Sequence, residues 1–349
     1  MVPALAVADA LRARGAEVSF LGTRERAEAE LVPASGYEID FLRVRGLDRR
    51  NPIRAAGAIA LAARAVPAAR RALRDRGAEA LLGGGGYVAG AGGLAAVSLG
   101  LPLVLTEADR HLGLTNRWLS RRARRVCLAF PIPGREGERY LVTGRPVPAE
   151  IGSADRGRAR ERFEIAADDR CLLVFGGSQG ARTINLAALD AFAGGDDGQR
   201  PYHVLHIAGH RDYAQARERL ERAGNVPRYT LLEYEPGLAH ALAASDLVLA
   251  RAGGSIFEIA AAGRPAILVP YPYASARHQH ANAAWMAEAG AAVVVEDSEL
   301  NGELVRRLAG ELLADPPRLE RMGAASASLA RPDAADQVAA EVLAATEHE

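Results

Sequence analysis

The chain has 349 residues, of which 49% are hydrophobic and 25% charged, and its formal net charge is zero. This length allows two domains with a core each, and the composition is ordinary for a globular protein. The sequence contains no lysine, which excludes a Walker-type phosphate lysine and a Schiff-base lysine. Cys127 and Cys171 are too few for a disulfide framework or a zinc cluster, and their apolar surroundings predict buried thiols.

Short apolar runs alternate with helical stretches along the chain, which is typical of parallel sheets with crossover helices. In the first half, the pattern predicts helices over residues 3–14, 24–30, 52–74 and 114–122 and after the glycine loop 83–86. It predicts strands over residues 17–21, 80–82, 102–106, 125–129 and 140–143. The segment 144–157 mixes proline, glycine and charge and is typical of a linker.

A second alternating series follows this linker. Strands are predicted over residues 171–175, 202–207, 229–232, 247–250, 266–269 and 292–295, and helices over 182–192, 237–244, 255–262, 279–289 and 300–346, the last interrupted by prolines. Two Rossmann-like halves joined in this way are typical of the α/β architecture called GT-B, in which two domains face a ligand cleft. We expect one domain over residues 1–147, with a C-terminal helix 333–349 packing back on it, and a second over 148–332.

The chain opens on a predicted helix, with Pro3 in its first turn and Leu5, Val7 and Leu11 on one face. A Rossmann half normally opens on a strand that lies in the middle of its sheet. We therefore expect the N-terminal first strand of the fold to be missing from this sequence.

Two glycine-rich loops of the second half each follow an apolar strand and precede a helix. Glycine lets backbone N–H groups approach an anion, and a helix N-terminus adds partial positive charge. In the loop 176–180 the hydroxyl of Ser178 could donate to a phosphate, although a plain turn is the alternative. In the segment 251–258, Ser255 and Glu258 fit a capping box, whereas the functional alternative gives the Glu258 carboxylate two ribose hydroxyls. Two such loops indicate a ligand with two or more phosphates.

Polar side chains also open the predicted helix 279–289. Gln279 and Asn282 are three positions apart and share one helix face, where amides suit sugar hydroxyls. A polar helix N-terminus without a ligand is the alternative. His278 and His280 point apart on a helix, so we expect no metal site.

In the first half, the segment 83–93 holds far more glycine than a turn needs, which indicates a second phosphate-bearing ligand. Glu107 follows the next strand at its carboxyl end, where the sites of α/β proteins lie, although it could be a surface carboxylate.

Residues 43–76 hold ten arginines and two acidic residues, and Ile53, Ile59, Leu61 and Val66 are interleaved. A basic face with apolar residues could dock on anionic lipid head groups. The alternatives are a solvated helix or nucleic-acid binding. The lack of aromatic residues between the arginines counts against single-stranded nucleic acid.

Taken together, these motifs resemble the MurG family of glycosyltransferases, which adds N-acetylglucosamine to lipid I in peptidoglycan synthesis. The similarity runs nearly end to end. It is carried by residues 3–8, 85–90, 113–116, 175–181, 251–258, 260–263, 265–270 and 278–282.

The resemblance implies a GT-B fold and an inverting transfer that needs no metal or cofactor. In that reaction the muramoyl C4 hydroxyl attacks the anomeric carbon of UDP-N-acetylglucosamine. The resemblance implies the following donor-site residues: Ser178, Gln179, Gly253, Gly254 and Ser255 at the phosphates, Glu258 at the ribose, Gln279 and Asn282 at the sugar, and the backbone of Tyr234 and Glu235 at the uracil. It implies Gly85, Gly86, Tyr87 and Asn116 for the acceptor. The implied partners are UDP-N-acetylglucosamine, undecaprenyl-linked lipid I and an anionic membrane surface at the cytoplasmic face of the plasma membrane, and not nucleic acid.

The sequence departs from the family pattern at four places, one of which is that the segment 251–258 is one residue shorter than the common form. Thr106-Glu107-Ala108-Asp109 stands for the usual His-Glu-Gln-Asn, so only Glu107 is nominated as general base, and the linker motif ends in Pro148 instead of arginine. The family's opening glycine-rich segment with its histidine is also missing. We therefore expect Met1 to be an internal methionine of a longer protein, and the 349-residue form to bind UDP but transfer sugar poorly. The alternatives are a related enzyme acting on another lipid, a UDP-sugar-binding protein with impaired catalysis, and a UDP-sugar epimerase.

Overall fold

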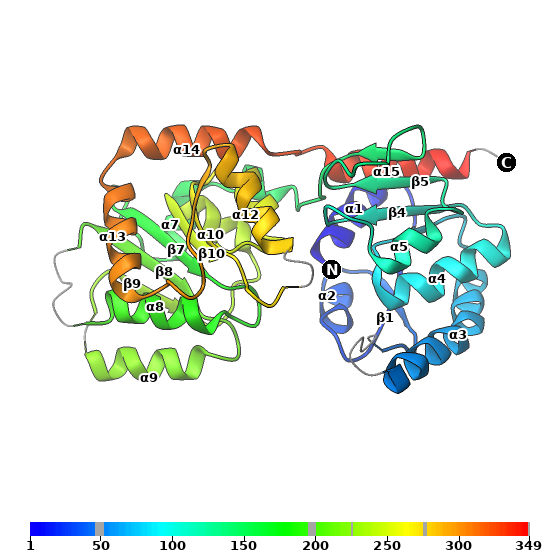
Figure 1. The fold of residues 1–349 in the computed structure, drawn as a ribbon, viewed down its shortest axis with the longest axis horizontal. Coiled ribbons are helices and arrows are strands. Elements are labelled where there is room, and N and C mark those ends of the chain that lie inside the picture. The colour runs from blue at the N-terminus through cyan, green and yellow to red at the C-terminus, as the bar shows by residue number, and fades with distance from the viewer. Residues whose placement is uncertain (46–51, 195–199, 225, 275–277, 348–349) are drawn as a thin grey trace. The chain divides into compact units, whose positions relative to one another are not determined.

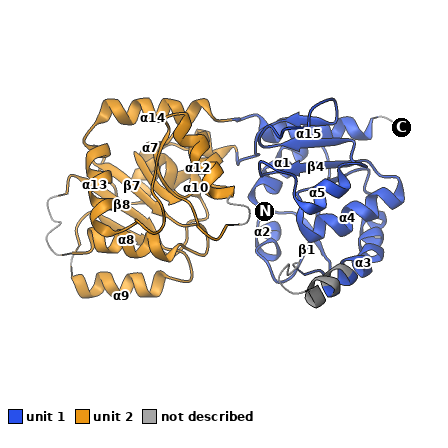
Figure 2. Ribbon diagram, in the orientation of Figure 1, with its two compact units in different colours: residues 1–148, 331–349 blue, residues 149–330 orange. Residues whose placement is uncertain are grey.

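The computed structural model describes residues 1–45, 52–194, 200–224, 226–274 and 278–347, with the side chains of 52–56, 58 and 59 left out. The chain divides into two compact units. Unit 1 comprises Met1–Pro148 and Arg331–Glu349, and unit 2 comprises Ala149–Ala330 (Figure 2). The chain thus leaves unit 1, forms unit 2 without interruption and returns to unit 1.

The strands of unit 1 form two parallel sheets (Figure 1). One sheet contains β1 (Ser19–Gly22) and β2 (Glu38–Phe41). The other runs in the order β3 (Leu81–Gly83), β4 (Leu103–Glu107), β5 (Arg125–Leu128) and β6 (Tyr140–Val142). The apolar residues of β4 and β5 are almost fully buried, as expected for parallel strands that helices cover on both faces.

Alternate residues of these strands point to opposite faces, and each face has its own helices. Val104 and Cys127 face α1 and α15, whereas Leu105 and Val126 pack with α5. The helices of unit 1 are α1 (Val2–Arg12), α2 (Glu28–Ala34), α3 (Pro52–Asp75), α4 (Gly86–Leu99), α5 (Leu114–Leu119) and α15 (Ala334–Thr346).

Helix α15 joins the core of unit 1 although it follows unit 2 in the sequence. Val7 and Leu11 of α1 form one buried cluster with Val338 and Val342 of α15. The predicted periodicity of the first helix is therefore confirmed, and its apolar face is buried partly by residues more than 300 positions away.

Unit 2 contains one parallel sheet in the order β12-β11-β10-β7-β8-β9. Its strands are β7 (Arg170–Phe175), β8 (Tyr202–Ile207), β9 (Tyr229–Leu232), β10 (Leu247–Arg251), β11 (Ala266–Val269) and β12 (Ala292–Val294). The strand order reverses between β7 and β10. The carboxyl ends at such a reversal are where open parallel sheets bind ligands.

The helices of unit 2 are α6 (Glu150–Ser153), α7 (Arg156–Arg162), α8 (Arg182–Phe192), α9 (Tyr213–Ala223), α10 (Leu238–Ala244), α11 (Ile256–Ala261), α12 (His278–Glu288), α13 (Gly302–Leu313) and α14 (Pro316–Ser328). The core lies between β7, β10 and β11 on one side and α8 and α13 on the other. Within it, the ring of Phe192 meets that of Tyr202 edge to face, with centroids 6.0 Å apart.

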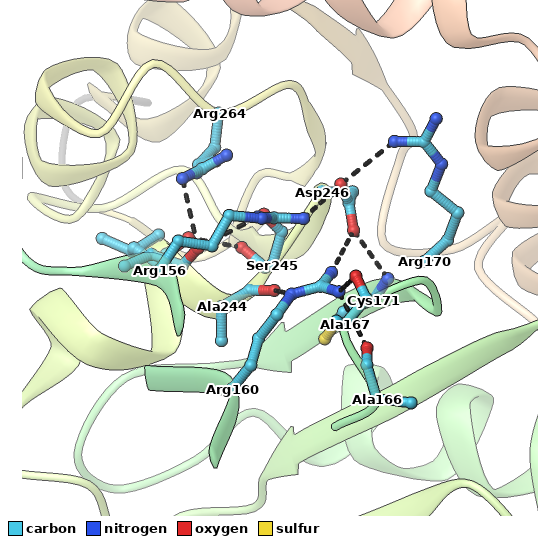
Figure 3. A network of polar contacts seen from close by, with 12 residues as sticks. Arg156, Arg160, Ala166, Ala167, Arg170, Cys171, Ala244, Ser245, Asp246 and Arg264 are labelled. Carbon is cyan, nitrogen blue, oxygen red and sulfur yellow. Dashed lines mark hydrogen bonds and ion pairs between the residues drawn. The ribbon is translucent and has the colours of Figure 1, made fainter. Parts of the chain in front are cut away.

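A carboxylate whose side chain is 9% exposed connects α7 to the sheet (Figure 3). Asp246, immediately before β10, accepts hydrogen bonds from Arg156 at 2.7 Å, from Arg160 at 3.0 Å and from the backbone N–H of Cys171 at 2.9 Å. Arg170 donates to the same carboxylate at 3.3 Å. Burial lowers the pKa of the Arg160 guanidinium, which is 5% exposed. The negative charge of Asp246 therefore compensates the positive charge of the buried Arg160 guanidinium.

Several expected bounds are wrong. The helix predicted over 24–30 begins at Glu28, because the carboxylate of Glu28 accepts from the backbone N–H and the hydroxyl of Thr23 and holds the intervening residues in a turn. The linker predicted over 144–157 contains α6 and the start of α7. Both cysteines are buried, as predicted.

Candidate functional site

The loop after β7 is pressed against the loop after β8. A Cβ placed on Gly176 would lie 2.3 Å from the Cβ of Ala181, and one on Gly180 would lie 2.1 Å from the carbonyl oxygen of Ala208. Gly180 also has a φ of +80°, which side chains other than glycine rarely adopt. The loop therefore requires glycine, and it leaves Ser178 and Gln179 exposed just before α8.

The loops after β8 and β9 join the same edge of the sheet. The backbone N–H of His210 donates to the carbonyl of Ser178 at 3.3 Å, and its imidazole stacks on Tyr234 with ring centroids 5.1 Å apart. The structure thus brings Tyr234 to the loop that carries Ser178. The sequence analysis did not single out His210, which is the link between them.

Glu235 has its side chain engaged within unit 2. Its carboxylate accepts from Arg162 at 2.8 and 2.9 Å and from the backbone N–H of Gly237 at 2.7 Å, and the residue is 8% exposed. This side chain therefore shapes the loop after β9.

A series of hydrogen-bonded polar side chains next to these loops fixes the position of the loop after β8. Asn185 of α8 donates to the carbonyl of Ala208 at 2.8 Å, and its Oδ1 is 3.0 Å from Nε2 of His206. Because that Oδ1 is an acceptor, Nε2 of His206 donates and Nδ1 accepts from the hydroxyl of Tyr229 at 2.7 Å. Burial lowers the pKa of His206 to about 3, so the ring is neutral.

The loop after β10 meets the start of α12. Nδ2 of Asn282 donates to the carbonyl of Ala252 at 3.0 Å, and Oε1 of Gln279 accepts from the backbone N–H of Tyr271 at 2.9 Å. Nε2 of Gln279 lies 3.7 Å from where a Cβ on Gly253 would be. The predicted set of Gly253, Gln279 and Asn282 is therefore brought together, and Asn282, 6% exposed, fixes the loop.

Ser255 precedes α11, but its side chain accepts no capping hydrogen bond. The capping-box alternative is therefore wrong for its hydroxyl. Glu258 lies in the first turn of α11 and is half-buried, and Gly254 is half-buried beside Ser255.

Arg251 connects the elements that carry the two glycine loops, and the sequence analysis did not assign it this role. Its guanidinium donates to the hydroxyl of Thr183 at 2.6 Å and to the carbonyl of Val269 at 3.2 Å, and it forms an ion pair with Asp297. The Thr183 hydroxyl donates to Asp297 at 2.7 Å. Since Thr183 lies in the first turn of α8, the group ties the helix after the first loop to the strand before the second. No local pattern connects residues this far apart in the sequence.

In unit 1, the glycine loop after β3 is lined by Asn116. Gly85 and Gly86 have φ values of +81° and +76°, and α4 begins there with Tyr87 in its first turn. A Cβ on Gly85 would lie 3.5 Å from Nδ2 and 3.8 Å from Oδ1 of Asn116. Asn116 is 2% exposed, and its Oδ1 has no hydrogen-bond partner among the residues that the structure describes. An acceptor atom is therefore held unsatisfied beside this loop.

Glu107 holds the segment that follows β4. One carboxylate oxygen accepts from the backbone N–H groups of Ala108 and Asp109 at 3.0 and 3.2 Å. The other accepts from the N–H of Gly113 and from Nδ2 of Asn116, at 2.8 and 2.9 Å. The residue is 7% exposed, so four donors occupy a buried carboxylate.

The basic region is described only in part. Arg49 and Arg50, and the side chains of Ile53, Arg54 and Ile59, lie outside the described residues. Arg64, Arg71 and Arg74 of α3 are exposed, whereas Arg76 pairs with Glu38 and Asp40. Val66 packs against the core of unit 1, so it belongs to the buried side of α3.

Across the ranges that the structure describes, no helix is long and apolar enough to span a bilayer. The same ranges hold no group of three or more histidine, cysteine, aspartate or glutamate side chains placed to bind a metal ion.

Comparison with known proteins gives the family. Residues 1–128 match the glycosyltransferase family 28 N-terminal domain, and residues 171–338 match the family 28 C-terminal domain. The UDP-N-acetylglucosamine--N-acetylmuramyl-(pentapeptide) pyrophosphoryl-undecaprenol N-acetylglucosamine transferase of Alkalilimnicola ehrlichii is 44% identical, over 97% of this chain and 93% of that protein.

Solved structures agree with this. The crystal structure of Acinetobacter baumannii MurG has a TM-score of 0.74 and 30% identity, covering 98% of this chain and 95% of that one. A Neisseria meningitidis UDP-GlcNAc 2-epimerase, at 14% identity and a TM-score of 0.69 over 98% and 96% of the two chains, shares only the fold. Both domain models match in order along the chain, and the fold is of the GT-B type. This chain therefore belongs to glycosyltransferase family 28, in its MurG branch.

Proposed function

We propose that this chain transfers N-acetylglucosamine from UDP-N-acetylglucosamine to the C4 hydroxyl of the muramoyl sugar of lipid I, giving lipid II, with inversion at the anomeric carbon. The full-length similarity to proteins named for this transfer is the observation that carries the proposal. The reaction takes place at the cytoplasmic face of the plasma membrane, to which the chain binds as a peripheral protein.

The donor site lies at the carboxyl ends of β7–β11. Ser178, Gln179 and the N-terminus of α8 receive the phosphates of UDP together with Gly253, Gly254 and Ser255. The partial positive charge of the helix end stabilises the charge that develops on the leaving UDP. Glu258 accepts from the ribose hydroxyls, and Gln279 contacts the sugar while Asn282 holds the loop. The backbone of Tyr234 and Glu235 binds the uracil, since the Glu235 carboxylate is engaged elsewhere.

The acceptor site lies at the glycine loop of unit 1. Gly85 and Gly86 present backbone N–H groups to the diphosphate of lipid I, with Tyr87 beside them. The unpartnered Oδ1 of Asn116 accepts a hydrogen bond from the bound acceptor. Glu107 has both oxygens occupied, so this geometry argues against its role as general base and in favour of its positioning Asn116.

The test is an incubation with labelled UDP-N-acetylglucosamine and lipid I, with UDP binding measured by calorimetry. We expect Glu258→Ala and Glu258→Gln to weaken UDP binding about tenfold or more, because a hydrogen bond to a charged group contributes about 1.5–3 kcal/mol. Glu320→Gln, at an exposed site on α14, is the matched control. UDP affinity unchanged in both Glu258 variants would remove the ribose assignment. Epimerisation of the donor at C2 without transfer would replace the proposed reaction with that of the epimerases.

Membrane docking is proposed for two basic surfaces of unit 1. One is the exposed arginine face of α3. The other is a hollow beside α5, where Trp118 and Leu114 are 64% and 53% exposed; it is also lined by Arg117, Arg121, Arg135, Arg139 and Tyr140. An exposed tryptophan ringed by arginine suits the interface of an anionic bilayer.

Vesicle co-sedimentation tests this docking. We expect binding to require anionic lipid and to fall as salt rises, since exposed charges are screened over about 8–10 Å. Trp118→Ala with Arg121→Ala should weaken binding to the same vesicles more than Arg217→Ala does, Arg217 being an exposed arginine on α9. Equal binding to neutral vesicles at high salt would reject the proposal.

A further inference from the structure

His210 lies between two loops of the proposed donor site in unit 2. The phosphate loop is the segment 176–180 after β7, and the base loop is the segment 233–237 after β9. Because β8 lies between β7 and β9 in the sheet, the segment after β8, which contains His210, lies between these loops. The donor site proposed above does not include this residue.

The base loop is poor in backbone hydrogen bonds. The carbonyl of Glu233 accepts from the N–H of Gly209 at 2.9 Å. In the next two residues, Tyr234 and Glu235, neither the backbone N–H nor the carbonyl bonds to another residue that the structure describes. Their backbone groups are therefore available to a ligand. Backbone of this kind takes its position from the side chains around it.

Two side-chain contacts join His210 to the base loop. Its ring stacks on that of Tyr234, with centroids 5.1 Å apart and planes inclined by 28°. Its Nδ1 lies 2.9 Å from Oε1 of Glu233, and because an ionised carboxylate only accepts, Nδ1 donates. Within the described ranges of the chain, Tyr234 makes no other ring contact and no side-chain hydrogen bond. The imidazole is therefore the support on which Tyr234 rests.

The backbone of His210 is itself fixed relative to the phosphate loop. Its N–H donates to the carbonyl of Ser178 at 3.3 Å. The preceding Gly209 has a φ of +82°, and a Cβ there would lie 2.1 Å from the backbone nitrogen of Gly180. The carbonyl of Gly209 accepts from the N–H of Tyr213, at the start of α9, at 3.1 Å. His210 thus connects the base loop to the phosphate loop through one short stretch of well-held backbone.

The stacked ring contributes more to this connection than the charged pair does. The side chains of His210 and Glu233 are each 50% exposed, and ion pairs at such exposure contribute little. A stacked aromatic pair changes an equilibrium by about three- to tenfold beyond the effect of its buried area. A different planar ring at position 210 should therefore replace most of what histidine does there.

We propose that His210 is a positioning residue for the nucleotide base of the donor. Its ring supports Tyr234 and so holds the backbone groups of Tyr234 and Glu235 at a set place relative to the phosphate loop. Uracil offers an N–H donor and a carbonyl acceptor to such groups, whereas cytosine offers an acceptor and a donor in the reverse order. A backbone held in place therefore selects uracil, because cytosine would leave polar groups unpaired. This inference rests on the proposed function, since it takes UDP as the ligand.

The experiment measures the Kd of UDP, CDP and inorganic pyrophosphate by calorimetry in the 349-residue chain and its variants. His210→Ala removes the ring, whereas His210→Phe keeps a planar ring without the bond to Glu233. We expect His210→Ala to raise the Kd of UDP about three- to tenfold and to change the Kd of CDP and of pyrophosphate by less than about twofold. His210→Phe should return the Kd of UDP to within about twofold of that of the unaltered chain.

Two further variants serve as controls. Glu233→Gln keeps an acceptor for Nδ1 and removes only an exposed charge, so it should change the Kd of UDP by less than about twofold. Gln215→Ala, at an exposed position of α9, should leave all three Kd values unchanged. The melting temperature of each variant shows whether unit 2 is folded, and His210→Phe provides the comparison if His210→Ala is not.

Three results would overturn the inference and leave the proposed function intact. The first is an unchanged Kd of UDP in His210→Ala, and the second is an equal loss of UDP and CDP affinity. The third is weaker binding of both UDP and pyrophosphate in His210→Ala and His210→Phe alike, which would make the imidazole a direct phosphate contact. If the unaltered chain binds no UDP, the proposed function fails and this inference fails with it.

Discussion

Replacing Glu107 with glutamine separates a structural carboxylate from a catalytic one. The carboxylate accepts four hydrogen bonds through two oxygens, from three backbone N–H groups and from Asn116. A glutamine amide has one oxygen, so two of the four donors would face its NH₂ group. At about 1.5–3 kcal/mol for each hydrogen bond to a charged group, the loss is about 3–6 kcal/mol. That is a large part of the roughly 5–15 kcal/mol by which a domain is stable.

The assay is unfolding in guanidinium chloride, followed by hydrogen exchange in β4 and β5 so that the transition of unit 1 is read separately from that of unit 2. Glu79→Gln, at an exposed position of the same unit, should change the free energy of unfolding by less than about 0.5 kcal/mol. We expect Glu107→Gln to lower it by several kcal/mol and to speed amide exchange between Ala108 and Gly113. If Glu107→Gln is as stable as Glu79→Gln but has lost sugar transfer more than about 100-fold, the range given for general bases, the carboxylate is catalytic and our reasoning is refuted.

Three further outcomes are expected. Asp246→Ala should lower the free energy of unfolding of unit 2 by about 3–5 kcal/mol, because Arg160 keeps a buried charge without its partner; a loss below 1 kcal/mol in denaturant unfolding would contradict this. Burial holds the pKa of His206 near 3 in the folded chain against 6.5 ordinarily, so below pH 6.5 the unfolded chain binds the extra proton. Stability should therefore fall by about 1.4 kcal/mol per pH unit from pH 6 toward 3.5 on account of this residue, and His206→Gln should remove that part of the slope in pH-dependent unfolding. Gln279→Ala should raise the Kd for UDP-N-acetylglucosamine about tenfold and leave that for UDP unchanged in calorimetry, since the amide is assigned to the sugar; equal weakening of both ligands would contradict the assignment.

The sheet of unit 2 was predictable because its strands are mostly apolar runs bounded by turns. The bounds of β8, β9 and β11 match the predicted ranges, and α8 matches too. Helix α9 was not predicted, because nearly half of its residues are charged and, of its eleven residues, Ala216 alone is buried. β2 was missed for a related reason, since this short edge strand lacks a continuous apolar run.

The site was predictable where the residues lie in local motifs and not where they meet across the fold. Glycine loops before helices, and the spacing of Gln279 and Asn282, are visible in the sequence. The group of Arg251, Thr183 and Asp297 is not, because it forms only once β10, α8 and the segment after β12 are packed. The engagement of Glu107 by Asn116 and Gly113 likewise depends on how the chain turns after β4.

The return of the chain to unit 1 sets an order in which the protein can be built during translation. Unit 2 is one uninterrupted stretch and can complete its core as soon as it leaves the ribosome. Unit 1 cannot complete its core at that point, because Val7 and Leu11 pack against Val338 and Val342, which are synthesised after unit 2. At about 5–20 residues per second, the two helices emerge roughly 15–65 seconds apart. For that interval the nascent chain carries an uncovered apolar helix face, so this enzyme should depend on holding chaperones most strongly while it is being made.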